Sequence, residues 1–163
     1  MTLIPALHAV FCSNFVAYYK SHASHVNVVG RHFVSDHELL NKIYDDLQDE
    51  IDSLGEILRT VDAFFPLTLS DVLDGSLVND NLMPDYEDGV GYLTDVYDDL
   101  DILISTYQDL ESAASSREDS HIANYAQDRV RTLKKFCCAY DIFTNILKDQ
   151  KNIIFIILLR HIF

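Results

Sequence analysis

Four side chains between residues 37 and 56 have chemistry that could bind a metal ion. On an α-helix, which turns by about 100° per residue, His37, Asn41, Asp52 and Glu56 fall within an arc of roughly 100°. Imidazole, amide and carboxylate groups are all metal ligands in proteins. Polar side chains four residues apart are also common on the solvated face of a helix. The spacing alone therefore leaves two interpretations open, a metal site and a solvated face.

The distance along the helix limits how a metal site could form. His37 and Asp52 are fifteen residues apart, which is about 22 Å along a straight helix axis. One helix cannot place both side chains on the same ion. A shared ion needs a second, antiparallel copy of the helix, so that His37 of one chain meets Asp52 and Glu56 of the other. A shared site therefore predicts a homo-oligomer with a two-fold contact.

A long helix is needed to position these residues. Ser35 and Glu38 match the Ser-x-x-Glu capping box that opens a helix, and Pro66 is a residue that closes one. We therefore expect a helix from Ser35 to about Phe64. Beside the polar row, the apolar residues that recur at helical spacing and would face a core are Leu39, Leu40, Ile43, Leu47, Ile51, Leu54 and Leu58.

The rest of the chain also favours helices. The spacing of apolar residues predicts long helices over residues 2–28, 90–110 and 120–148. Residues 66–84 form a long crossover that contains a short helix ending at Gly75. Only five glycines and three prolines occur in 163 residues, which suits helices better than a turn-rich β fold. Four long helices with one long connection between the second and the third describe a ferritin-like four-helix bundle, so the predicted fold class is all-α.

Charge and cysteine content limit the partners. The chain carries 26 acidic and 12 basic residues, a formal charge of −14. Such a charge repels nucleic-acid phosphates and attracts cations, so DNA binding is not expected. Cys12 and the pair Cys137–Cys138 lack metal-ligand spacing, and we expect reduced core thiols in a cytoplasmic protein. The first twenty residues lack a basic leader and a cleavage site, so no signal peptide is expected.

The last residues differ in composition from the rest. Residues 153–159 are seven consecutive apolar residues, too few to span a bilayer, so no membrane partner is expected. They are also too apolar to be exposed to water without association. We therefore divide the chain into one domain, residues 1–149, and an apolar C-terminal extension, residues 150–163. This extension packs on the bundle or on a neighbouring subunit, or it is poorly ordered.

The segment HVNVVGRHFVSDHELLNKIYDDLQDEIDSLGE resembles the signature of the Dps family, the small shell-forming relatives of ferritin. In that family His-Trp-Asn-Val precedes a Gly and a His-Glu-Leu sequence, and an Asp and a Glu four residues apart follow on the same helix. Here His25 opens the pattern, His37 follows, and Asp52 and Glu56 supply the carboxylate pair. The resemblance covers about residues 5–148. It implies a hollow shell of twelve subunits in which these four residues are the catalytic metal ligands.

The chain departs from the family pattern at two positions. Val26 stands directly after the first histidine, where the family usually has Trp. Asn41 stands four residues after the second histidine, where the family has a carboxylate. A neutral amide is a poorer ligand for a hard cation than a carboxylate. The resemblance therefore implies one complete iron position and a weakened second one that includes Asn41.

The resemblance also implies the chemistry, a ferroxidase activity. Fe(II) is oxidised to Fe(III) with hydrogen peroxide or dioxygen as acceptor, and the ferric mineral is stored inside the shell, which protects against oxidative damage. Carboxylates suit Fe(III), and imidazoles favour Fe(II) as it enters. Asp119 and Asp128, near the start of the last predicted helix, could line entry pores for iron, with solvated surface acids as the alternative reading.

Two other functions remain open from the sequence. A Dps-type shell can coat DNA, but the relatives that do so use a lysine-rich tail, and the C-terminal extension of this chain is apolar. The bundle could also be purely structural, with a degenerate metal site. Aerobic addition of iron, followed by colour, separates this second alternative from a ferroxidase.

Overall fold

The computed structural model describes residues 2–81 and 89–160, with side chains as far as residue 141. Within these residues the chain forms helices and no strand, which confirms the all-α prediction. The far end of the predicted crossover, near residue 84, lies outside the described residues. The helices are α1 (Leu3–Asn27), α2 (Phe33–Thr60), α3 (Leu69–Gly75), α4 (Gly89–Ser115) and α5 (Ser120–Arg160).

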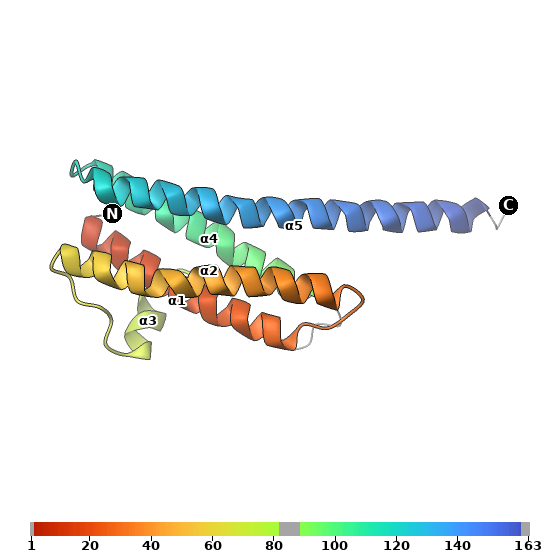
Figure 1. Ribbon diagram of the computed structural model, residues 1–163, viewed down its shortest axis with the longest axis horizontal. Coiled ribbons are helices and arrows are strands. Elements are labelled where there is room, and N and C mark those ends of the chain that lie inside the picture. Colours follow the sequence, from red (N-terminus) through yellow and green to blue (C-terminus); the bar gives the residue numbers. More distant parts are fainter. Residues whose placement is uncertain (1, 82–88, 161–163) are drawn as a thin grey trace.

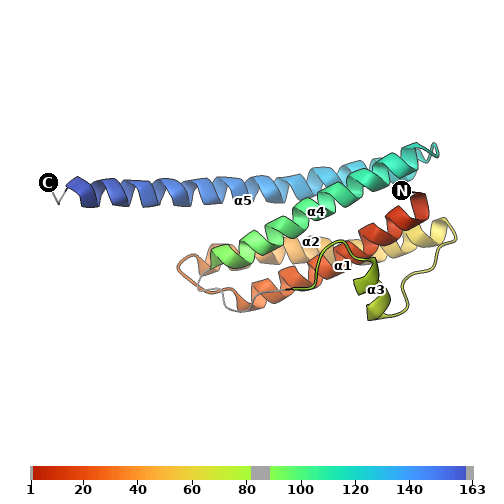
Figure 2. The same ribbon diagram turned by 180° about the vertical axis from the view of Figure 1, so that it is seen from behind.

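The four long helices form a bundle of two helix pairs. α1 lies beside α2, α4 lies beside α5, and the short α3 packs against α1 on the outside of the bundle (Figures 1 and 2). The apolar stripe predicted for α2 faces the interior, where Leu40, Leu47, Leu54 and Leu58 are fully buried. Together with the buried apolar residues of the other helices they form one core, whose burial drives folding. No helix among the described residues is both long and apolar enough to cross a bilayer.

The predicted boundaries of α2 need correction at both ends. The helix begins at Phe33, and its first residue is preceded by His32 without a side-chain cap. The Ser35 hydroxyl instead donates to the carbonyl of His32, so the predicted capping box at Ser35 is wrong. At the other end the helix stops at Thr60, before the predicted Phe64, because Asp62 adopts a φ of 59° and turns the chain. A short polar side chain tolerates that left-handed conformation.

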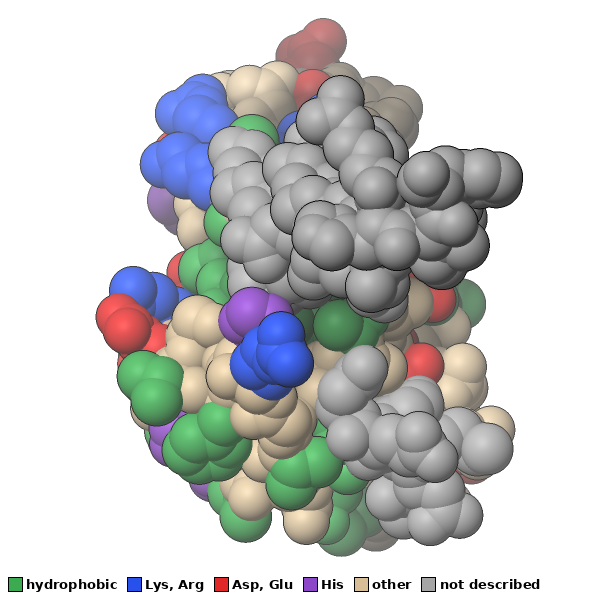
Figure 3. Space-filling view, turned by 90° about the vertical axis from the view of Figure 1, so that its right-hand side faces the viewer, with side chains coloured by type: hydrophobic (Ala, Val, Ile, Leu, Met, Phe, Trp, Pro, Cys, Tyr) green, Lys and Arg blue, Asp and Glu red, His purple; other side chains and the backbone are tan. Residues whose placement is uncertain are grey.

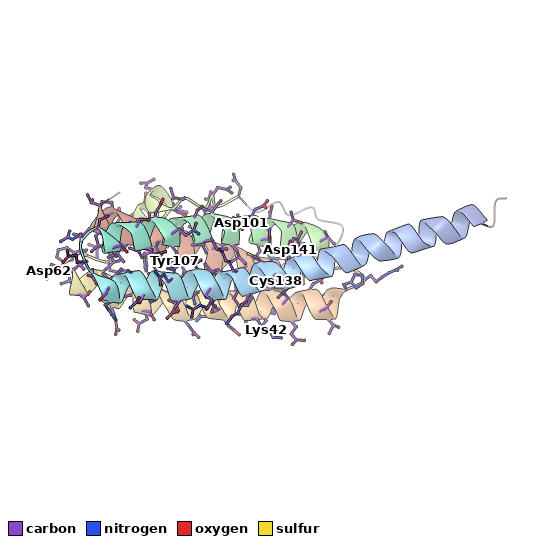
Figure 4. All side chains as sticks on the ribbon, turned by 90° about the horizontal axis from the view of Figure 1, so that it is seen from above. Lys42, Asp62, Asp101, Tyr107, Cys138 and Asp141 are labelled. Carbon is purple, nitrogen blue, oxygen red and sulfur yellow. The ribbon has the colours of Figure 1, made fainter. Side chains whose placement is uncertain are left out.

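The first residue of α5 agrees with the prediction, and its last residue does not. The Asp119 carboxylate accepts a hydrogen bond from the backbone N–H of Ile122, which caps the helix start. The helix then continues past the predicted end at residue 148 to Arg160, a length of 41 residues or about 60 Å. It extends beyond the ends of the other helices (Figure 4). The proposed division between residues 149 and 150 therefore falls inside one helix, and it stays a prediction.

The interior of the bundle contains a buried ion pair. Lys20 of α1 lies 2.8 Å from the Asp99 carboxylate of α4, and both side chains are only 4% exposed. Burial raises the pKa of Asp99 to about 6, although the Lys20 ammonium lowers it. Two of the three thiols are buried, and burial raises the pKa of Cys12 and of Cys137 to about 11. Cys138 is exposed, so the prediction of core thiols is wrong for that residue.

Candidate metal centre

The two predicted histidine ligands lie together at one end of the bundle. His25 is in the last turn of α1, and His37 is in the second turn of α2. The short connection between the helices reverses the chain at Gly30, whose φ of 115° favours a residue without a side chain. The two imidazole rings stack with centroids 3.6 Å apart and an angle of 25° between their planes. Helix pairing thus places the two histidines that were predicted to be metal ligands in contact.

Reciprocal hydrogen bonds hold the histidine pair. Nδ1 of His25 lies 2.9 Å from the carbonyl oxygen of His37, and Nδ1 of His37 lies 2.9 Å from the carbonyl oxygen of His25. A carbonyl oxygen only accepts, so each Nδ1 must carry the proton and donate it. In a neutral imidazole the lone pair then remains on Nε2. This arrangement, a ring fixed through one nitrogen, is the one that orients metal-binding histidines.

Aromatic rings surround the pair. Phe33 stacks on His37 with centroids 5.1 Å apart. On the other side, Tyr44 approaches His25 edge-on with centroids 5.0 Å apart, and His22 stacks on Tyr44 at 4.3 Å. At this end of the molecule, histidine and apolar side chains reach the surface (Figure 3). The pair is therefore half-buried within a ring cluster and still accessible from solvent.

Asn41, the predicted weak ligand, has partners within its own helix. Its amide nitrogen donates to the Asp45 carboxylate at 2.6 Å, and its amide oxygen accepts from the Tyr44 hydroxyl at 3.1 Å. The amide oxygen has a second lone pair. Asn41 therefore retains at most one acceptor position for an ion.

The predicted carboxylate ligands do not reach the histidines of the same chain. Asp52 and Glu56 are exposed and lie on α2 fifteen and nineteen residues after His37, about 22 and 28 Å along the helix axis. Among the described residues neither carboxylate has a hydrogen bond or an ion pair. Within this part of a single chain, no three His, Cys, Asp or Glu side chains are grouped so that they could hold a metal ion. One chain thus contains two separated halves of the predicted centre.

A second carboxylate pair on α2 has a different environment. Asp46 and Glu50 face α5, where the Arg129 guanidinium lies 2.6 Å from Asp46 and 3.2 Å from Glu50. The Tyr125 hydroxyl also donates to Glu50. These carboxylates raise the pKa of Arg129 although burial opposes them. One guanidinium offsets one of the two carboxylate charges, and all four carboxylate oxygens have a partner within the chain.

The two predicted pore residues have partners in their own helix. Asp119 is half-buried and caps α5, as described above. Asp128 is exposed and lies 3.0 Å from Arg131 in an i,i+3 ion pair. A Glu-x-x-His pair at Glu118 and His121 does not form an interior site, because both side chains are exposed and Glu118 precedes the helix with a φ of 58°. A pore function for Asp119 and Asp128 stays a prediction.

Tyr44 and His22 also adjoin the histidine pair, and neither was predicted from the sequence. A helical signal was available, because His22 precedes His25 by three residues and Tyr44 follows His37 by seven, so each lies on the same helix face as its histidine. The contact between Tyr44 and His25 joins two helices, however, and no spacing within one helix predicts it.

Comparison with known proteins identifies the fold. The model of the ferritin-like domain matches residues 4–137. Among solved structures, the Dps protein of Vibrio cholerae, described as a member of a superfamily of ferritin-like diiron-carboxylate proteins, is 25% identical, with a TM-score of 0.81 over 87% of this chain and 88% of that one. No curated protein matches in sequence.

Two further structures have the same fold at lower identity. Dps of Listeria monocytogenes is 17% identical, with a TM-score of 0.84 over 89% of this chain and 94% of that one. A dodecameric thioferritin, the bacterioferritin-related protein of Bacteroides fragilis, is 14% identical, with a TM-score of 0.84 over 92% and 89%. These likenesses agree with the predicted ferritin-like bundle with a short helix in the crossover.

Proposed function

The chain belongs to the ferritin-like family, and on this basis we propose that it is an iron-storage ferroxidase of the Dps type that acts in the cytoplasm. It oxidises Fe(II), its substrate, with hydrogen peroxide or dioxygen and stores the Fe(III) product as a mineral. Each centre combines His25 and His37 of one chain with Asp52 and Glu56 of a second copy. Consumption of Fe(II) and hydrogen peroxide in this reaction protects against oxidative damage.

The proposal rests on two half-sites, the pair His25 and His37 and the pair Asp52 and Glu56, whose ligand atoms are available. His25 and His37 are fixed through Nδ1, so that Nε2 of each ring has its lone pair available. Asp52 and Glu56 are exposed carboxylates that no cation of the described chain neutralises. Two imidazoles and two carboxylates form a donor set that suits iron in both oxidation states.

Each residue has a separate role in this proposal. The imidazoles bind Fe(II) on entry, because a nitrogen ligand favours the softer ion. Asp52 and Glu56 neutralise the charge that appears on oxidation to Fe(III) and favour the product. Asn41 offers one amide oxygen lone pair to a second iron position, which is therefore the weaker one. The chain charge of −14 attracts further cations toward the centre.

The surface supports assembly through α1, α2 and α3. The large apolar side chains that are exposed in the described part of the chain all lie between Ile4 and Leu77. Several are more than half exposed: Tyr19, Val26, Val34, Phe64, Leu67, Leu69 and Leu77. Clustered apolar side chains of this kind mark association surfaces. Because one relative is described as dodecameric, we propose a closed shell of twelve chains with two-fold contacts on this side.

Subunit mixing tests the shared centre. The variant His25→Ala/His37→Ala lacks one half-site, and Asp52→Ala/Glu56→Ala lacks the other. Each preparation alone should assemble and oxidise Fe(II) slowly. If the two are mixed in denaturant and refolded together, half of the two-fold pairs are mixed, and one centre of each mixed pair receives all four ligands. Rapid oxidation should therefore return to about a quarter of the wild-type rate.

The mixing experiment also has outcomes that contradict the proposal. Co-assembled shells that stay as slow as the separate preparations would show that the ligands are not shared between chains. Wild-type protein that oxidises Fe(II) no faster than protein-free buffer, with either oxidant, would overturn the ferroxidase function. Light scattering provides the assembly control, because a stable monomer at neutral pH has no shared centre.

A further inference from the structure

We propose that Tyr44 donates one electron to the reaction, so that a centre with a single iron reduces hydrogen peroxide completely. This inference rests on the proposed ferroxidase function and concerns the same centre. Fe(II) supplies one electron when it is oxidised, and hydrogen peroxide needs two to form water. A centre whose second iron position is weak must obtain the second electron elsewhere.

The position of Tyr44 suits this role. Its ring contacts the ring of His25 at 5.0 Å between centroids, and His25 stacks on His37 at 3.6 Å. The phenol therefore lies one ring contact from the groups that would bind iron. On its other side Tyr44 stacks on His22, with centroids 4.3 Å apart and planes only 17° from parallel. These contacts hold the tyrosine ring against the centre in a fixed orientation.

Asn41 links the missing ligand to the proposed electron donor. It stands four residues after His37, on the same helix face, and its amide oxygen accepts the hydrogen bond of the Tyr44 hydroxyl at 3.1 Å. Its amide nitrogen is held by Asp45 at 2.6 Å. The side chain best placed to complete a second iron position is therefore neutral and oriented toward Tyr44. Asn41 is a positioning residue in this proposal.

The electron balance closes with named reactants. One Fe(II) loses one electron to become Fe(III), and the Tyr44 phenol loses one electron and its hydroxyl proton to become a neutral tyrosyl radical. Hydrogen peroxide accepts both electrons. It also takes up two protons, one from Tyr44 through solvent and one from bulk water, and is released as two molecules of water. No hydroxyl radical is left over.

Rapid-freeze electron paramagnetic resonance tests the proposal. Anaerobic protein that carries one Fe(II) per centre receives one equivalent of hydrogen peroxide. Wild type should show a tyrosyl signal, and Tyr44→Phe should reduce it at least tenfold. The matched control is Tyr140→Phe, because Tyr140 is also half-buried, bonds Thr94 through its hydroxyl at 2.8 Å and packs on Tyr97 at 4.5 Å, but belongs to the α4–α5 pair. That variant should keep the full signal.

Stoichiometry gives a second readout. With limiting peroxide in the first turnover, wild type should oxidise one iron per peroxide, whereas Tyr44→Phe should oxidise two. Asn41→Asp, which supplies the carboxylate, should also move the ratio toward two and weaken the radical signal.

The outcomes separate this proposal from the proposed function. A signal that persists in Tyr44→Phe, or a wild-type ratio of two with no signal, overturns the role of Tyr44 while Fe(II) oxidation continues. If Fe(II) is oxidised no faster than in buffer, the ferroxidase function fails first, and the role of Tyr44 fails with it.

Discussion

Helix α2 carries two pairs of carboxylates with the same spacing, and the two pairs have opposite environments. Asp46 and Glu50 are four residues apart, as are Asp52 and Glu56. The first pair faces α5 and binds Arg129, whose side chain is 8% exposed. The second pair is exposed and has no cation among the described residues. A shift of six residues rotates a side chain by about 240° around the helix, which accounts for the difference.

The inward pair, Asp46 and Glu50, is structural, whereas the outward pair, Asp52 and Glu56, is a candidate functional pair. A carboxylate whose oxygens are paired within the chain contributes to folding and is not available to an external cation. A carboxylate that the chain leaves without a cation costs some stability through repulsion and remains free to bind one. Substitutions in and around the two pairs should therefore have opposite effects on stability.

The largest effect is expected at the inward pair. Arg129→Met leaves Asp46 and Glu50 partly buried without their cation, so the free energy of unfolding should fall by about 3–5 kcal/mol. Urea unfolding followed by circular dichroism at fixed protein concentration measures it. Arg131→Met is the matched control, because Arg131 lies on the same helix with a side chain 70% exposed, and the change there should stay within about 0.5 kcal/mol.

A third variant shows whether the loss comes from unpaired charge. Asp46→Leu/Glu50→Leu added to Arg129→Met removes the whole cluster and should restore most of the lost stability, because apolar replacement of a complete buried ion pair is often neutral. Equal losses in Arg129→Met and Arg131→Met would contradict the structural role of the inward pair.

The interior acid Asp99 should give a pH-dependent effect. Burial raises the pKa of Asp99 to about 6 in the folded protein. As the pH rises, the Asp99 carboxyl therefore ionises at a lower pH in the unfolded chain than in the folded one. The contribution of Asp99 to stability is therefore full below its ordinary pKa of 3.8 and is lost as the pH passes 6. The stability of wild type relative to Asp99→Asn should fall over this range, by up to about 3 kcal/mol. A constant or rising difference would mean that Lys20 outweighs burial.

The bundle was largely predictable because its signals are local. The stripe from Leu40 to Leu58 repeats every three or four residues, and such a pattern has one stable solution, burial against other helices. The ends of α2 were not predictable in the same way. Ser35 and Glu38 have the capping sequence, but the helix has already begun at Phe33, and the observed capping box is at Thr68 and Asp71. Several short sequences are able to cap a helix, and tertiary contacts determine which of them does so.

The site was predictable only in its residue types. Spacing along α2 pointed to His37, the resemblance added His25, and helix pairing brings the two rings into contact. Nothing in the sequence indicated that their Nδ1 atoms bind each other's carbonyl oxygens, or that Tyr44 of α2 reaches His25 of α1. These contacts depend on the axial register of two helices, which spacing within one helix does not contain.

The smallest effect, with the opposite sign, is expected at the outward pair. Asp52 and Glu56 are exposed like charges one helical turn apart, and such a pair destabilises a helix by about 0.2–0.5 kcal/mol. Asp52→Asn/Glu56→Gln keeps the shape of both side chains and removes the repulsion. Without metal, the melting temperature should therefore stay equal or rise slightly, whereas Arg129→Met lowers it.

Added metal should reverse the order of the two melting temperatures, so that wild type becomes more stable than Asp52→Asn/Glu56→Gln. An ion that binds only the folded state stabilises it in proportion to the logarithm of its concentration over Kd. Co(II), which resists oxidation in air, should raise the melting temperature of wild type and leave that of Asp52→Asn/Glu56→Gln unchanged. Asp49→Asn/Asp109→Asn removes two other exposed acids, one from α2 and one from α4, and should respond to Co(II) as wild type does. If all three proteins shift equally, the ion responds to net charge alone, and the outward pair has no function that distinguishes it from the rest of the acidic surface.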